Sequence, residues 1–206
     1  NWPDNSAAYN NLGTIMRDAG KFDDALHNYR MAISINPTFE EAHLNLGLVF
    51  REIGQLENSR KSMETATDIN RRFPEAHYQL GNTFSKLREP DLAIASYNLA
   101  LEIRPDYTDV YNAMGRELTE LGRFEEAVTN FKRVLDLDPA DEKFGVRLML
   151  AHIGTADAPT RTPVPFLRDY YRRNINRWDR GSAKYLGHLM VEAAVSDNFK
   201  PNKQSS

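Results

Sequence analysis

The sequence contains no cysteine, which excludes disulfide bridges, thiolate metal sites and cysteine nucleophiles over all 206 residues. It has no uninterrupted run of about 18 apolar residues, the length that a membrane-spanning helix needs. Neither sign of charge dominates, because 26 basic residues stand against 29 acidic ones and the net charge is −3. The charge balance therefore shows no footprint of nucleic-acid binding. With 41% apolar and 27% charged residues, the composition is that of an ordinary soluble globular protein.

Motifs that would indicate catalysis are also missing. The sequence has no phosphate-binding G-x-x-x-x-G-K-[ST] loop, no G-x-S-x-G, no H-E-x-x-H and no calcium-loop pattern. His43 and His77 lie 34 residues apart, but Tyr9 and Tyr111 lie a further 34 residues before and after them. A tyrosine in the same place favours packing over metal binding. We therefore expect a non-enzymatic protein with no metal and no cofactor.

What the sequence does contain is an internal repeat of 34 residues. The same interval relates four Leu-Gly or Met-Gly pairs and one apolar column: Leu12-Gly13, Leu46-Gly47, Leu80-Gly81 and Met114-Gly115; Met16, Phe50, Phe84 and Leu118. Prolines close the first, third and fourth units, at Pro37, Pro105 and Pro139, and Arg71 stands in that place in the second. A fixed period of this size indicates a stack of similar supersecondary units.

Each unit has the pattern of two helices joined by a short turn. In the first unit Tyr9, Leu12 and Met16 are spaced by three and four residues, which makes one apolar helical stripe. Gly20 follows, where the chain can leave that helix, and Pro37 ends the second helix. We therefore expect four units, at residues 6–39, 40–73, 74–107 and 108–141.

This pattern resembles the tetratricopeptide repeat (TPR), in which a large residue, Leu-Gly, an aromatic residue, Ala, a second aromatic residue, Ala and Pro recur at fixed steps. The resemblance covers residues 6–141. It implies an all-α, right-handed superhelical solenoid of four helix-turn-helix repeats, whose first helices line a concave groove that binds other polypeptides. The second unit departs most from the pattern, at Ser59 and Arg71, and we expect local looseness there.

The side chains off the Leu-Gly stripe should face the groove. Asn11, Asn45 and Gln79 form one column of amides, each just before a Leu-Gly pair. An amide both donates and accepts, so a row of amides can pair with the backbone of an extended peptide. The Ala-x-x-Asn-Leu-Gly motif resembles the asparagine ladder of the O-linked N-acetylglucosamine transferase repeats, although such amides can instead simply join neighbouring helices. The other candidate groove residues are Asn10, Arg17, Arg51, Leu48, Tyr78, Asn82, Asn112 and Arg116.

Two further patterns bear on the ligand. Arg17 and Arg51 form an arginine column, which either binds carboxylates through paired hydrogen bonds or is an ordinary solvated face. Repeats that clamp the terminal carboxylate of chaperone tails use a fixed Lys/Asn/Asn/Lys/Arg set. In that frame only Asn45 matches, so the sequence argues against chaperone C-terminal tails as partners.

Residues 142–153 predict a capping helix, because the last apolar face of a solenoid otherwise lacks a neighbour. For residues 154–206 we expect a linker and a helical C-terminal extension, with a basic helix at 166–178. That helix is either a solvated cap or an element that docks on a partner or a membrane surface. Phe166-Leu167 and Trp178-Asp179 also resemble the linker of TPR–methyltransferase fusion proteins.

The sequence as a whole indicates a non-catalytic scaffold or adaptor that binds a peptide or helix of another protein in the groove. The alternatives are the repeat module of a larger methyltransferase or glycosyltransferase, or a structural subunit of a large complex. We expect no nucleic-acid partner and no transmembrane segment. The compartment stays open, with the cytoplasm as the default expectation.

Overall fold

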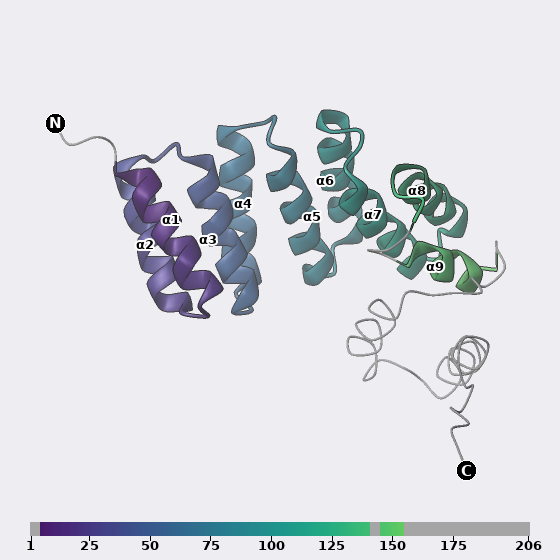
Figure 1. The fold of residues 1–206 in the computed structure, drawn as a ribbon, viewed down its shortest axis with the longest axis horizontal. Coiled ribbons are helices and arrows are strands. Elements are labelled where there is room, and N and C mark those ends of the chain that lie inside the picture. The colour runs from purple at the N-terminus through teal and green to yellow at the C-terminus, as the bar shows by residue number, and fades with distance from the viewer. Residues whose placement is uncertain (1–4, 141–144, 155–206) are drawn as a thin grey trace, which may run out of the picture. The chain divides into compact units, whose positions relative to one another are not determined.

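The computed structural model describes residues 5–140 and 145–154, and the regular structure within these residues is entirely α-helical. The chain divides after Leu121 into two compact units, which are taken one at a time. The first unit contains α1 (Ser6–Asp18), α2 (Phe22–Ile35), α3 (Glu40–Glu52), α4 (Leu56–Ile69), α5 (Pro74–Leu87), α6 (Pro90–Ile103) and α7 (Thr108–Glu120) (Figure 1). The second contains α8 (Phe124–Leu137) and α9 (Val146–His152). The predicted all-α class, with consecutive helix pairs, is confirmed.

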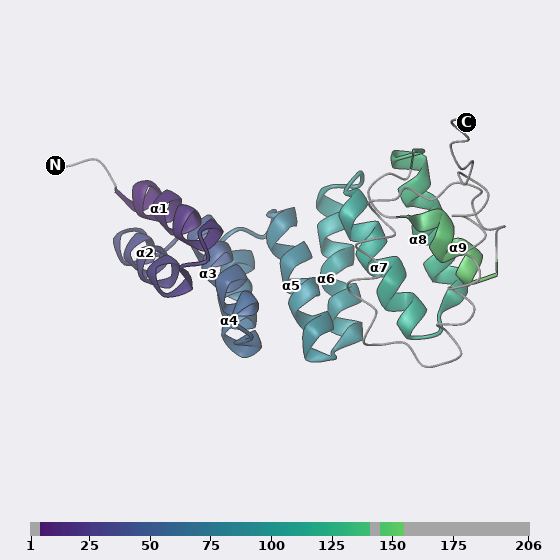
Figure 2. The same cartoon turned by 60° about the horizontal axis from the view of Figure 1, so that its bottom comes forward.

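The helices of the first unit pack in chain order. Helices α1 and α2, α3 and α4, and α5 and α6 form antiparallel hairpins, and each hairpin contacts the first helix of the next (Figure 2). The first helices also contact one another, α1 with α3, α3 with α5 and α5 with α7. They make a continuous surface, which we call the first-helix face.

Large side chains of the second helices fill the junctions between hairpins. Leu26 and Tyr29 of α2 form one buried cluster with Leu46, Val49 and Phe50 of α3. All of them are at most 9% exposed. Burial of side chains of this size contributes roughly 1.5–3 kcal/mol each relative to leaving them in water, so these clusters hold successive hairpins together.

The glycine of the Leu-Gly pair is required by a close approach. A Cβ atom at position 81 would lie 2.5 Å from Cε1 of Tyr97, far inside the contact distance of two carbon atoms. Tyr97, which is 2% exposed, therefore packs against α5 only because residue 81 has no side chain. Gly13 and Tyr29 have the same relationship in the first hairpin.

The turns within the hairpins use a left-handed backbone. Gly20 and Gly54 have φ angles of 73° and 80°, which glycine adopts without strain. Arg88 occupies the same place in the third hairpin and has a φ angle of 65°. A residue with a Cβ atom is strained in that conformation, so this turn is the least favourable of the three.

The second hairpin does not show the looseness that we expected at Ser59. Ser59 and Thr83 are both 0% exposed, and their hydroxyl oxygens lie 3.2 Å apart, across the junction of α4 and α5. The hydroxyl of Thr83 also donates to the backbone carbonyl of Gln79 at 3.0 Å. The departure from alanine at position 59 is therefore matched by a buried polar partner, which corrects the expectation for Ser59, whereas that for Arg71 stays a prediction.

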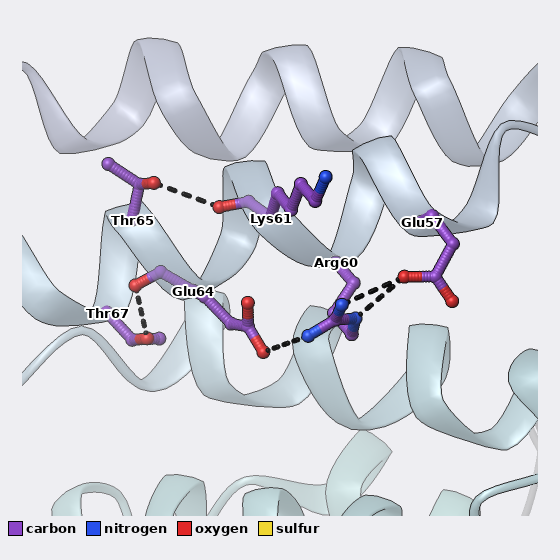
Figure 3. Close-up of polar contacts among 6 residues, drawn as sticks. All are labelled: Glu57, Arg60, Lys61, Glu64, Thr65 and Thr67. Carbon is purple, nitrogen blue, oxygen red and sulfur yellow. Dashed lines mark hydrogen bonds and ion pairs between the residues drawn. The ribbon is translucent and has the colours of Figure 1, made fainter.

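The outward surface of α4 is covered by ion pairs. Arg60 donates to Glu57 one turn before it and to Glu64 one turn after it, at 2.9 Å in both cases (Figure 3). Thr65 and Lys61 are exposed on the same helix. This is the ordinary solvated face of a helix, stabilised by neighbours three and four residues apart.

Helix α1 differs from the later first helices, because no hairpin precedes it in the described part of the chain. Ile15 is 61% exposed, whereas Val49, in the same column, is 0% exposed. Leu12 and Leu46 differ in the same way, at 39% and 9%.

In the second unit α8 buries Ala127, Phe131 and Val134, and α9 packs against α8. The predicted capping helix at 142–153 begins later than expected, at Val146, because Gly145 before it has a φ angle of 61° and is not helical. Residues 142–144 and the predicted extension at 155–206, with its basic helix, lie outside the described residues. None of the described helices is both long and apolar enough to cross a membrane.

Candidate functional site

The candidate residues predicted from the sequence all lie on the first helices, α1, α3, α5 and α7. They differ in how far solvent reaches them. Asn11 and Arg116 are exposed, whereas Asn10 is only 9% exposed. The half-buried ones are Asn45, Gln79, Arg17, Arg51, Leu48, Tyr78, Asn82 and Asn112.

Two of the predicted amides join neighbouring hairpins. The Nδ2 atom of Asn45 donates to Oδ1 of Asn10 at 2.9 Å, across α3 and α1. Because Asn10 is buried and engaged in this bond, our prediction that it contacts a ligand is replaced by a supporting role. Asn11, one residue later, is exposed, and of the two predicted amides on α1 it is the one open to a ligand.

A hydrogen-bonded chain crosses the centre of the first-helix face. The guanidinium of Arg51 donates to the backbone carbonyl and to Oε1 of Gln79, at 3.2 and 2.8 Å. Asn82 donates to the same Oε1 at 3.3 Å and accepts from the Tyr97 hydroxyl at 2.9 Å. The chain links α3 through α5 to α6, so the position of each of these side chains depends on the others.

The guanidinium of Arg51 has an unusual electrostatic setting. Burial lowers its pKa from the ordinary value, and the nearby Tyr78, Glu52 and Tyr97 only partly oppose this effect. Its hydrogen bonds go to a neutral amide. Arg17, in the same column, instead pairs with the Asp18 carboxylate at 3.1 Å. The two members of the predicted arginine column are therefore not equivalent.

Aromatic rings lie beside this chain. The ring of Tyr78 is 6.2 Å from that of Tyr97 and 5.3 Å from that of Tyr107, measured between centroids. Burial raises the pKa of the Tyr97 hydroxyl above its ordinary value, and the charge of Glu117 adds to the effect. Burial likewise raises the pKa of Tyr107 to about 12, helped by the charge of Glu75.

Sequence reasoning missed Glu117. Its side chain is 9% exposed and accepts a hydrogen bond of 2.6 Å from the Ser85 hydroxyl, which links α7 to α5. Position 117 belongs to the column of Ile15, Val49 and Thr83. A carboxylate in a column that is otherwise apolar or weakly polar is the signal that would have identified it.

The two histidines are used structurally. The Nε2 atoms of His43 and His77 lie 3.0 Å from the backbone carbonyls of Pro37 and Arg71, six residues upstream. The hydroxyl of Tyr111 donates to the Pro105 carbonyl at the same distance, 3.0 Å. Since a carbonyl only accepts, each Nε2 atom donates, and the histidines secure the turn between hairpins as the tyrosine does. Over residues 5–140 and 145–154, no three acidic or histidine side chains gather as metal ligands would.

Comparisons with known proteins identify the family. Models described as "TPR repeat" and "Tetratricopeptide repeat" match residues 13–52, 74–107, and 40–73 with 108–141, which together extend over residues 13–141 and more than half of the chain. No curated protein matches the sequence.

The fold is found in several solved structures. A structure of MamA has a TM-score of 0.65 and 21% identity, and the match covers 84% of this chain and 94% of MamA. YrrB, a TPR protein with an unusual peptide-binding site, has a TM-score of 0.60 and 18% identity over 91% and 90% of the two chains. The first TPR of Spaghetti (RPAP3), bound to the HSP90 peptide SRMEEVD, has a TM-score of 0.55 and 18% identity, over 57% of this chain and 93% of that one. At these identities the likeness shows the fold, and together with the matched repeats it establishes that this chain belongs to the tetratricopeptide repeat family.

Proposed function

We propose that this protein is a non-catalytic interaction scaffold, which binds an extended segment of a partner protein on the first-helix face. The observation that carries the proposal is that polar side chains lie on four successive first helices, α1, α3, α5 and α7, which contact one another in that order. Asn11 on α1 and Arg116 on α7 are exposed, and Arg51 and Gln79 lie on the helices between them. An extended peptide needs hydrogen-bond partners for its backbone, and such side chains supply donors and acceptors.

Two structural neighbours support this proposal. YrrB has a peptide-binding site, and the RPAP3 repeat is bound to a peptide. This chain lacks the lysines of the frame that clamps chaperone tails, since Asn10 and Glu75 stand in those places. We therefore propose an internal segment of a partner as the ligand, rather than a chaperone C-terminal tail.

Affinity capture from a lysate of the source organism tests the proposal with three baits. The first is the unaltered chain. The second carries Asn11→Ala and Arg116→Ala, which change exposed side chains at the two ends of the face. The third carries Lys61→Ala and Thr65→Ala, which are exposed on α4, a second helix. Because none of these side chains is buried, all three baits should fold equally well.

The proposal predicts partners that the first and third baits retain and the second bait loses, as read by mass spectrometry. Partners retained by the second bait and lost by the third would place the binding surface on the second helices. That result would contradict the proposal and would favour a structural subunit that packs on a larger complex.

A further inference from the structure

Arg51 stands out among the half-buried arginines of the first unit because of what its guanidinium contacts. Arg17, Arg60 and Arg104 each pair with a carboxylate, of Asp18, of Glu57 and Glu64, and of Glu75 respectively. No ion pair of Arg51 occurs among the described residues, where both of its hydrogen bonds go to Gln79. It is also half-buried, so water reaches it only in part, and the charge of the neighbouring Glu52 acts on it without an ion pair.

Arg51 has an acidic neighbour in sequence, Glu52, but forms no ion pair with it. Asp18 and Glu52 occupy the same column, each directly after an arginine. Arg17 bonds to Asp18 through Nε and Nη2, at 3.2 and 3.1 Å. Arg51 instead points across to α5, where Gln79 holds it, and Glu52 stays exposed. The guanidinium is therefore fixed in position with its positive charge still available.

Fixation matters because a guanidinium has more N–H donors than its contacts with Gln79 use, and the remaining donors keep a planar arrangement. The amide of Gln79 is itself held by Asn82, and Asn82 by Tyr97. A ligand group that binds here meets a donor whose rotamer freedom is already lost, so less entropy is lost on binding.

A second arginine lies near the same place. The charges of Arg51 and Arg116 both act on the hydroxyl of Tyr97, lowering its pKa against the larger effect of burial. Glu117, a buried acid whose charge also acts on that hydroxyl, accepts a hydrogen bond from Ser85. Two positive charges, from α3 and α7, and the negative charge of Glu117 therefore lie around Tyr97.

We propose that Arg51 is the binding site for a side-chain carboxylate, an aspartate or glutamate, within the extended segment that occupies the first-helix face. The inference rests on the proposed function and specifies its ligand. Arg51 lies on α3, with first helices on both sides of it, α1 on one side and α5 and α7 on the other. A segment that crosses the face continues past Arg51 in both directions, so the carboxylate belongs to a side chain rather than to the end of the peptide.

Peptide arrays test this assignment directly. The probes are synthetic peptides acetylated at the N-terminus and amidated at the C-terminus, so that only side chains carry carboxylates. Each acidic peptide is paired with a copy in which Asp or Glu is replaced by Asn or Gln. The array identifies binders, and fluorescence anisotropy then gives the dissociation constant of each pair.

We expect the unaltered chain to bind the acidic member of a pair about tenfold more tightly than its amide copy, as a charge-assisted hydrogen bond provides. Arg51→Met keeps an apolar stem like that of arginine without the guanidinium and should reduce this ratio to about one. Arg17→Met is the matched control, because its charge is already neutralised by Asp18, and the ratio should persist. Arg51→Lys should retain part of the ratio, since it keeps the charge without the planar fork.

The outcomes separate the two proposals. Peptides that bind through Asn11 without any acidic preference would overturn the role of Arg51 and leave the proposed function standing. An acidic preference that persists in Arg51→Met, or binding that requires a free C-terminal carboxylate, would also overturn it. No binding by any peptide would overturn both. If Arg51→Met does not fold, Arg51→Lys supplies the comparison, and an unreduced ratio in that variant would overturn the assignment.

Discussion

Asn45 and Asn10 share a hydrogen bond of 2.9 Å that joins the first helices of two hairpins. Asn10 is 9% exposed, so the bond is largely shielded from water. From the sequence both amides were candidates to contact a ligand. In the structure Asn10 joins two helices through a hydrogen bond, whereas the next residue, Asn11, is exposed.

This bond predicts an energetic coupling between the two asparagines. In a double-mutant cycle with Asn10→Ala and Asn45→Ala, we expect a coupling of about 1 kcal/mol, the usual net value of a hydrogen bond. Urea unfolding followed by circular dichroism measures it. Additive effects of the two single substitutions would show that the bond contributes nothing to stability.

The exposure of α1 predicts that substitution by alanine at equivalent positions of two hairpins lowers the free energy of unfolding by different amounts. Val49→Ala removes methyl groups from a fully buried site and should destabilise the protein by about 1–3 kcal/mol. Ile15→Ala, in the same column of α1, removes more atoms from a site that is 61% exposed, and should change stability by about 0.5 kcal/mol or less. Thermal unfolding of both variants checks the order. A larger loss for Ile15→Ala would mean that α1 is covered in solution.

The left-handed turns predict opposite changes in stability when glycine and arginine are exchanged at two of them. Arg88→Gly relieves a residue with a φ angle of 65° and should stabilise the protein by about 0.5–1 kcal/mol. Gly54→Arg introduces the same strain at a φ angle of 80° and should destabilise it by about 1–2 kcal/mol. A Cβ atom at position 54 would meet no atom within 4 Å, so we expect the cost to come from the backbone. Chemical denaturation measures both, and a loss of stability in Arg88→Gly would show that the arginine side chain matters more than its strain.

The buried tyrosines predict how stability depends on alkaline pH. Burial raises the pKa of Tyr107 from 10.0 to about 12, and a raised pKa means that the folded chain holds its proton longer than the unfolded chain. Between these two values the unfolded state binds fewer protons, so the free energy of unfolding falls as pH rises, and this contribution is fully present only below pH 10.

In Tyr107→Phe the free energy of unfolding should therefore fall less steeply as pH rises. Part of the decline should remain, because burial also raises the pKa of Tyr97. Urea unfolding at a series of pH values measures the slope, and the absorbance of tyrosinate locates the titration. An unchanged slope in Tyr107→Phe would show that this hydroxyl is not shielded in the folded state.

The sequence was sufficient to predict the helices because their signals are local. The interval between Leu-Gly pairs places the first helices, and Gly20 and Gly54 mark the turns that follow them. The hydrogen-bond partners of the polar side chains were not predictable in this way. Arg51 bonds to Gln79 rather than to its neighbour Glu52, and the two bonded residues are 28 apart in sequence and lie on different helices.

The misjudged positions share a physical cause. Asn10 and Glu117 are polar residues at positions that packing encloses, and each is tolerated because one partner, Asn45 or Ser85, satisfies it. Ser59 is tolerated for the same reason, through Thr83. Aligning the repeats of one sequence shows which positions are buried. It does not show the hydrogen-bond partner of a polar residue at such a position, because that partner lies in another hairpin.

The most direct test of the central claim is photo-crosslinking from single positions on the folded chain. A photoreactive amino acid replaces either Asn11, on the first-helix face, or Thr65, on the outward surface of α4, and both positions are exposed. After irradiation in lysate, mass spectrometry identifies the crosslinked peptides. The account predicts crosslinks from position 11 to an extended acidic segment of a partner, and none to that segment from position 65. Crosslinks to partner segments from position 65 alone would contradict it.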